Sequence, residues 1–168
     1  LVIRNGRVID GSGSTARTAD VAIDGDRIVE VGAVAGQGRR ELDADGAAVT
    51  PGWVDVHTHY DGQVSWDDRL DPSAGHGVTT VVTGNCGVGF APVRPGSEDW
   101  LVQLMEGVED IPGAALSEGI AWGWEHFGEY LDAIEAMPRG LNAGGYVGDV
   151  ALRLYVAGAR ACEPDFVA

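Results

Sequence analysis

Two histidines separated by one residue, His57 and His59, follow an apolar run in the stretch PGWVDVHTH, residues 51–59. A lone strand histidine is usually structural, whereas two neighbouring imidazoles on one face leave several ring nitrogens that need partners. A divalent metal ion accepts a lone pair from each ring, and neutral imidazole is a common zinc ligand. The pair therefore predicts a metal site.

A cysteine follows about one strand later, as Cys86 in the stretch TGNCG. A buried cysteine usually packs as a small apolar residue, and a cysteine beside a histidine can also act as an activated nucleophile. The surrounding residues resemble no known nucleophile elbow or oxyanion-hole sequence, so the nucleophilic role ranks second. A thiolate that joins two imidazoles suits Zn²⁺ better than Mg²⁺ or Ca²⁺. We therefore expect His57, His59 and Cys86 to bind zinc.

The other candidate side chains have weaker patterns. Asp55 is expected either to accept a hydrogen bond from an imidazole N–H, behind the metal ligands, or to make an ordinary polar contact within its strand. His76 precedes the second strand at the end opposite the predicted site, which favours a role in a turn or in packing. His126 is expected to be exposed in the first turn of a helix, and Cys162 is expected to be structural.

Two predicted strands position the candidate ligands: a buried strand over GWVDVHTH and a second strand over GVTTVVTGNCG. Because successive strand side chains point to opposite faces, Asp55, His57 and His59 are expected on one face. The intervening SWDDRLDPSAGHG is expected to hold a loop and a short helix, since parallel strands need a crossover. Parallel sheets and barrels of α/β proteins carry their sites at the carboxyl ends of the strands, where the predicted ligands fall.

The first 50 residues have a different pattern, in which about five short strands form a meander joined by tight turns. Asn5-Gly6 and Asp24-Gly25 lie between alternating apolar residues, which is typical of two-residue hairpin turns. The character of the sequence changes at Pro51-Gly52. The predicted domains are therefore residues 1–50 and residues 51–168.

Two amphipathic helices are expected after the second strand. Ser97 is placed to cap the first, which begins at Glu98, and the second covers residues 125–137 and stops before Pro138. Apolar side chains at helical spacing are expected to pack in the core: Leu101, Leu104, Met105 and Val108 in the first helix, and Phe127, Tyr130, Leu131 and Ile134 in the second. The stretch GLNAGGYVGDVALRLYVAG indicates a third strand and the start of another helix.

Composition excludes several classes of partner. Hydrophobic residues make up 45% of the chain and charged residues 22%, which is typical of a folded, core-forming protein. Acidic residues outnumber basic ones 26 to 11, so phosphate backbones and anionic membrane surfaces are repelled. The sequence shows no leader and no long apolar run, and its two cysteines suit a reducing compartment, so a cytoplasmic protein is expected. The chain opens in mid-strand without a methionine, which indicates a fragment.

The combination of an opening β-meander, PGWVDVHTHYD and HGVTTVVTGNCGVGFAP resembles the amidohydrolase superfamily, in its branch of N-acyl-D-amino-acid deacylases (D-aminoacylases). The resemblance runs from the first residue to about residue 95. It implies an α/β fold that holds the first two or three strands of a (β/α)₈ barrel, preceded by the N-terminal part of a β-sandwich. It also implies one or two Zn²⁺ ions bound by His57, His59 and Cys86 at the mouth of the barrel.

The implied activity is the hydrolysis of a non-peptide amide C–N bond, most plausibly in a small N-acyl-D-amino acid. A general acid–base aspartate and two further histidines of the family are expected beyond residue 168. The isolated segment is therefore expected to be inactive. A full barrel takes about 250 residues, so this chain supplies only its beginning.

One departure from the resemblance bears on the substrate. Relatives often carry a histidine just before the segment that reads ALRLYVAG here, whereas this chain has Gly148-Asp149. Three alternatives compete with the deacylase interpretation: a dihydropyrimidinase-like cyclic amidase, which the GNCG cysteine disfavours; a non-catalytic metal-binding paralogue; and a purely structural fragment. Acyl specificity and oligomeric state have no signature in the sequence.

Overall fold

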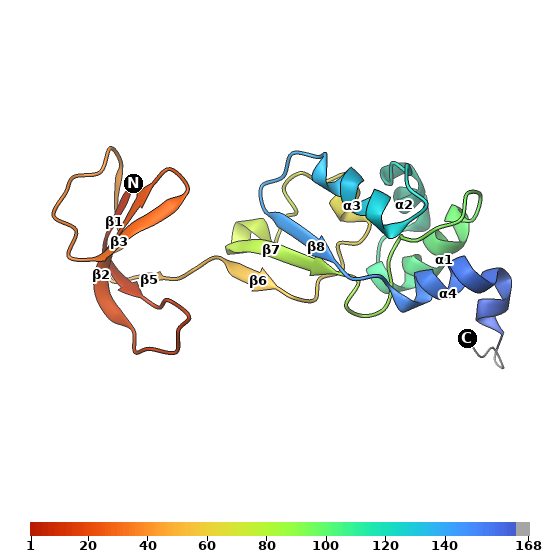
Figure 1. The fold of residues 1–168 in the computed structure, drawn as a ribbon, viewed down its shortest axis with the longest axis horizontal. Coiled ribbons are helices and arrows are strands. Elements are labelled where there is room, and N and C mark those ends of the chain that lie inside the picture. Colours follow the sequence, from red (N-terminus) through yellow and green to blue (C-terminus); the bar gives the residue numbers. More distant parts are fainter. Residues whose placement is uncertain (164–168) are drawn as a thin grey trace. The chain divides into compact units, whose positions relative to one another are not determined.

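The computed structural model describes residues 1–163, without the side chains of Glu109 and Cys162. The structural role expected for Cys162 therefore lies outside the described part. The chain divides into two compact units, Leu1–Pro51 and Gly52–Ala168. Each unit has its own sheet, and the second unit also has helices (Figure 1).

The first unit is a single five-stranded sheet with the order β3-β2-β1-β4, in which β5 also pairs with β1. Its strands are β1 (Val2–Val8), β2 (Arg17–Asp24), β3 (Arg27–Gly32), β4 (Glu41–Asp43) and β5 (Ala48–Val49). The number of strands agrees with the sequence, but the meander is wrong because β4 and β5 both run parallel to β1. The β-sandwich is not confirmed.

The two predicted hairpin turns of this unit have different outcomes. A two-residue turn does join β2 to β3 in an antiparallel pair, but its residues are Gly25 and Asp26, because Asp24 pairs with Arg27; Gly25 has a φ of 60°. Asn5-Gly6 instead lies inside β1, where Asn5 has a φ of 56° and the register against β2 shifts. A residue with positive φ can make a β-bulge as well as a turn, and only the pairing partners distinguish the two.

Arg4 of β1 connects four segments of the first unit. Its guanidinium donates to Asp20 of β2 (2.9 Å) and to both carboxylate oxygens of Glu41 in β4 (2.8 and 3.2 Å). It also donates to the carbonyl oxygens of Val34 and Gly36. The pKa of Glu41 is lowered first by its hydrogen bond from Arg4, and the pKa of Asp20 by the Asn5 N–H and then by Arg4.

Replacing Arg4 by lysine is expected to lower the melting midpoint of the first unit by a few degrees at neutral pH, because an ammonium group cannot reproduce the two-pronged contact with Glu41. Carboxyl groups whose pKa is lowered by folding add stability above their unfolded pKa and lose it as the pH falls through the folded pKa. The difference between Arg4→Lys and the parent should therefore shrink below about pH 4.

Far-UV circular dichroism melts from pH 3 to 7 measure this effect. All five tryptophans lie in the second unit, so their fluorescence should report an unchanged transition. Arg7→Lys, an exposed arginine on the same strand, is the matched control. A difference from the parent that is equally large at pH 3 and pH 7 would contradict the role of the ion pairs.

The second unit contains a parallel three-stranded sheet with the order β6-β7-β8. Its strands are β6 (Trp53–Asp55), β7 (Val78–Thr83) and β8 (Asn142–Gly145). These three parallel strands agree in number with the two or three barrel strands expected from the sequence. The described strands do not form a closed barrel. β6 is an edge strand, and Trp53, Val54 and Val56 are 57–61% exposed, so the prediction of a buried strand is wrong for this chain.

Helices connect and follow these strands. Short 3₁₀ turns at Gln63–Ser65 and Ala74–His76 form the crossover from β6 to β7. The α-helices are α1 (Glu98–Glu109), α2 (Gly113–Gly119), α3 (Phe127–Glu135) and α4 (Asp149–Ala157), and a 3₁₀ turn at Gly158–Cys162 follows. α1 and α4 lie beyond the arrowheads of the sheet, on its carboxyl side (Figure 1). Among the described residues, no helix has the length and apolar character needed to cross a membrane.

The helix boundaries agree closely with those predicted from the sequence, but the capping interactions differ from the prediction. α1 starts at Glu98 as expected, yet the Ser97 hydroxyl makes no capping hydrogen bond. His126 is the N-cap of α3 rather than a residue of its first turn, and it forms a capping box with Glu129. His126 is exposed, as predicted.

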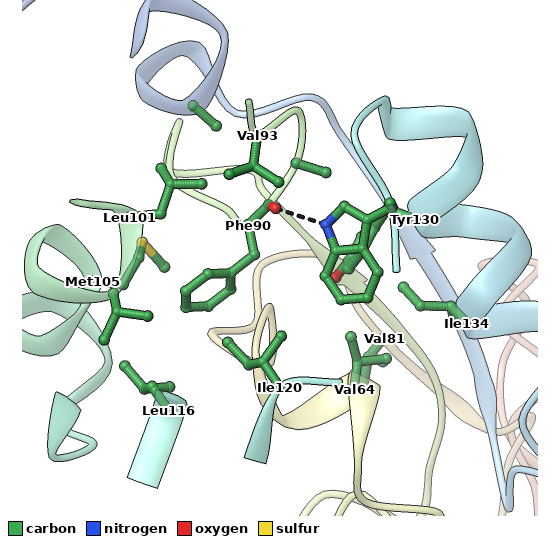
Figure 2. Close-up of a cluster of buried hydrophobic side chains, with 14 of the residues drawn as sticks. Val64, Val81, Phe90, Val93, Leu101, Met105, Leu116, Ile120, Tyr130 and Ile134 are labelled. Atoms are coloured by element: carbon green, nitrogen blue, oxygen red, sulfur yellow. Dashed lines mark hydrogen bonds between the residues drawn. The ribbon is translucent and has the colours of Figure 1, made fainter. Parts of the chain in front are cut away.

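The core of the second unit lies between the sheet and the helices that follow it. Phe90, from the loop after β7, is buried among side chains of α1 and α2, including Met105 and Leu116 (Figure 2). Trp124 donates its indole N–H to the Phe90 carbonyl (2.9 Å; dashed in Figure 2). The apolar side chains predicted to pack in the core are only partly buried. Leu101, Met105, Tyr130 and Ile134 are buried, whereas Leu104, Val108 and Leu131 are 36–41% exposed.

Candidate metal centre

The two histidines lie in a short segment that follows β6, residues 56–59, which we call the histidine segment. β6 ends at Asp55, so His57 and His59 are not on a continuous strand face as predicted. The segment nevertheless stays attached to the neighbouring strand, because the N–H of Thr58 donates to the carbonyl of Val82 in β7 (3.1 Å).

Cys86 lies in a tight turn directly after β7, residues 84–87, which we call the cysteine turn. The N–H of Gly87 donates to the carbonyl of Gly84 (3.0 Å) and closes the turn, so Cys86 is held near its tip. Gly84 and Gly87 have φ values of 77° and 87°, a conformation that strongly favours glycine. The thiol of Cys86 is exposed.

The histidine segment and the cysteine turn bring three donor atoms together. One ring nitrogen of His57, one of His59 and the sulfur of Cys86 all lie within 4.8 Å of one another. The two imidazole rings stack, with centroids 5.4 Å apart and an angle of 24° between their planes. Because the strands are parallel, their carboxyl ends place these side chains at the same edge of the sheet.

The donor set suits zinc in both chemistry and spacing. Two imidazoles and one thiolate are ligands that zinc prefers. With metal–ligand bonds of about 2.0–2.3 Å, the ligand atoms of a tetrahedral site lie roughly 3.5 Å apart. The observed donor atoms, all within 4.8 Å of one another, are compatible with such a site once the side chains close around an ion. Three protein ligands would leave further positions for residues outside this chain or for water.

Asp55 makes a local polar contact with the histidine segment. Its Oδ1 accepts a hydrogen bond from the backbone N–H of His57 (3.1 Å). The carboxylate therefore supports the backbone on which His57 is carried. His76 lies just before β7, at the amino end of that strand and away from the cysteine turn.

A buried carboxyl close to the site was not singled out from the sequence. Asp61 is 3% exposed, and its Oδ2 has no hydrogen-bond partner among the described residues. Burial raises the pKa of Asp61 to about 7, although hydrogen bonds from its own N–H, from the Gly84 N–H and from the Thr83 hydroxyl lower it. The acidic residue after HTHY was a signal for it, but burial of that residue is not a local property.

Asp149, the position at which relatives often carry histidine, lies at the start of α4 next to the cysteine turn. The N–H of Val150 donates to the carbonyl of Gly87 (2.9 Å), and a Cβ on Gly87 would lie 3.8 Å from that of Asp149. The Asp149 side chain is 71% exposed and makes a long contact to Arg153 (4.0 Å). A carboxylate therefore lies at the first residue of α4, next to the turn that carries the candidate ligand Cys86.

The sheet is parallel, its strands are joined by crossovers, and its carboxyl edge carries histidine and cysteine donors. This arrangement defines an α/β protein, a class whose enzymes carry their active sites at that edge. The chain belongs to the amidohydrolase family, whose sequence profile matches residues 40–163. Members of this family are hydrolytic enzymes. The resemblance inferred from the residues is therefore confirmed.

Several relatives are deacylases of N-acylated D-amino acids. The chain is 37% identical to a D-aminoacylase of Alcaligenes xylosoxydans xylosoxydans, covering 93% of this chain and 30% of that protein. A D-aminoacylase structure described for its binuclear metal centre is 36% identical and superposes with a TM-score of 0.72, covering 98% of this chain and 31% of that one.

A third relative is the N-acyl-D-glutamate deacylase of Bordetella bronchiseptica, whose structure holds zinc and a phosphonate inhibitor that mimics the tetrahedral intermediate. It is 32% identical with a TM-score of 0.69, over 95% of this chain and 31% of that one. The chain thus spans about a third of the length of these relatives.

Proposed function

We propose that the complete protein is a zinc-dependent deacylase that hydrolyses small N-acyl-D-amino acids to a carboxylate and a free amino acid. The observation that carries the proposal is the convergence of His57, His59 and Cys86 from two neighbouring strand ends. The GNCG cysteine supports a deacylase over a cyclic amidase, since this thiol is what sets the D-aminoacylase branch apart in the resemblance. The similarity to D-aminoacylases supports the substrate class.

The chain's own residues have defined parts in this proposal. His57, His59 and Cys86 hold one or two ions, Asp55 supports the His57 backbone, and the glycines of the cysteine turn keep the thiol at the sheet edge. When bound, zinc would polarise the acyl carbonyl and lower the pKa of a water molecule beside it to about 7. An aspartate beyond residue 168 serves as general acid–base. We place the reaction in the cytoplasm, where a reducing environment keeps the thiol available.

Hydrolysis of N-acetyl-D-amino acids and of their L-enantiomers by the full-length protein tests the proposal. We expect turnover of the D-enantiomers that is lost with a chelator and restored by Zn²⁺, and no turnover by the segment 1–168 alone. Hydrolysis of dihydropyrimidines in place of acyl amino acids would support the cyclic amidase. Zinc binding without turnover of either substrate class would support a non-catalytic paralogue.

A further inference from the structure

Asn85 makes a side-chain contact between the two segments that carry the candidate ligands. Its Nδ2 donates to the backbone carbonyl of Val56 at 2.9 Å. Asn85 directly precedes Cys86, and Val56 directly precedes His57. One hydrogen bond therefore connects the residue beside the thiol to the residue beside the first imidazole.

Other hydrogen bonds hold each segment to the strands and helices around it. Thr58 N–H to Val82 carbonyl joins the histidine segment to β7 before the cysteine turn begins. The turn itself is tied to α4 through Val150 N–H to Gly87 carbonyl, and Thr83, at the end of β7 just before the turn, accepts from the N–H of Tyr146, which follows β8 (3.0 Å). The Gly84 N–H also donates to the Asp61 carboxylate, two residues beyond the histidine segment, whereas the bond of Asn85 is made within the segment itself, directly beside His57.

We propose that Asn85 is a positioning residue that holds the cysteine turn against the histidine segment and so sets the separation between the Cys86 sulfur and the two imidazoles. Its effect on the ion rests on the proposed metal site, whereas its hold on the two segments does not. A polar partner that orients metal ligands is worth about 10–100-fold in metal affinity. Because the bond of Asn85 is exposed to solvent, we expect the lower end of that range.

Asn85→Asp is the informative variant. Aspartate suits tight turns nearly as well as asparagine, so the turn itself should persist, but a carboxylate cannot donate to the Val56 carbonyl. Asn85→Ala removes the same donor without adding a charge. The matched control is Asn142→Ala, because Asn142 also bridges two strands of this sheet, by donating to Thr80 Oγ1 (3.4 Å) at its opposite end.

The first measurement is amide hydrogen exchange of the chelator-treated protein, which needs no metal. We expect the Thr58 and Gly87 amides to exchange about fivefold faster in Asn85→Asp and Asn85→Ala, since loss of one hydrogen bond frees both segments. Asn142→Ala should exchange at these amides as the parent does. Unchanged exchange in both Asn85 variants overturns the proposal.

The second measurement is the binding of Zn²⁺ and of Co²⁺ as a spectroscopic probe. We expect zinc to bind about tenfold more weakly in the Asn85 variants and the thiolate-to-cobalt absorption band to lose intensity, with Asn142→Ala unchanged. Faster exchange together with parent-like zinc affinity and cobalt spectrum would overturn the positioning role. If the parent protein binds neither metal, the proposed function fails, and hydrogen exchange alone decides whether Asn85 holds the segments together.

Discussion

Zinc is expected to bind more than about 100-fold more weakly when either His57 or Cys86 is replaced by alanine, a larger loss than that expected for a residue that only orients a ligand. The reason is that each variant removes one of three donor atoms that lie within 4.8 Å of one another. With two donors left in this chain, the ion would depend on the ligands contributed from elsewhere.

Metal content after dialysis and competition with a coloured chelator measure this loss in the full-length protein. His76→Ala is the matched control, because His76 lies at the amino end of β7 rather than beside the cysteine turn, and it should retain zinc as the parent does. Parent-like zinc content in both His57→Ala and Cys86→Ala would remove these residues from the site.

A methyl group at position 84 is expected to destabilise the second unit by roughly 2–5 kcal/mol. A Cβ on Gly84 would lie 2.2 Å from the carbonyl oxygen of Tyr146, far inside van der Waals contact. Gly84 also has a φ of 77°, which costs any other residue about 1–2 kcal/mol. The Gly84→Ala variant must therefore move the cysteine turn away from the end of β8.

Gly96→Ala separates the two causes. Gly96 has a similar φ of 84°, but a Cβ there would meet no atom within 4 Å, so only the conformational cost of about 1–2 kcal/mol applies. Urea unfolding followed by tryptophan fluorescence gives both values, since the tryptophans lie in the second unit. Equal losses in Gly84→Ala and Gly96→Ala would show that the close approach to Tyr146 does not constrain the turn.

Both predictions concern the same feature, which is the closeness of backbone segments at the carboxyl edge of the sheet. The cysteine turn contacts Tyr146, just after β8, and α4 and, through Asn85, the histidine segment. Replacing Gly84 should therefore also displace the sulfur of Cys86. Thiol reactivity of Cys86 in Gly84→Ala would report such a displacement directly.

Sequence patterns were sufficient to predict the features that depend on local chemistry. The start of α1 at Glu98, the three parallel strands and the hairpin that turns at Gly25 follow from residue types and periodicity. So does the approach of His57, His59 and Cys86, because parallel strands necessarily bring their carboxyl ends to one edge. That these residues bind metal stays a prediction.

Tertiary structure alone decided which partners each segment meets. Whether Asn5-Gly6 forms a turn or a bulge depends on β2, and the parallel course of β4 and β5 depends on their pairing with β1. The burial of Asp61 and the reach of Asn85 to Val56 join residues 22 or more positions apart. Such contacts are set by long-range packing and backbone pairing, which leave no periodic signal in a single sequence.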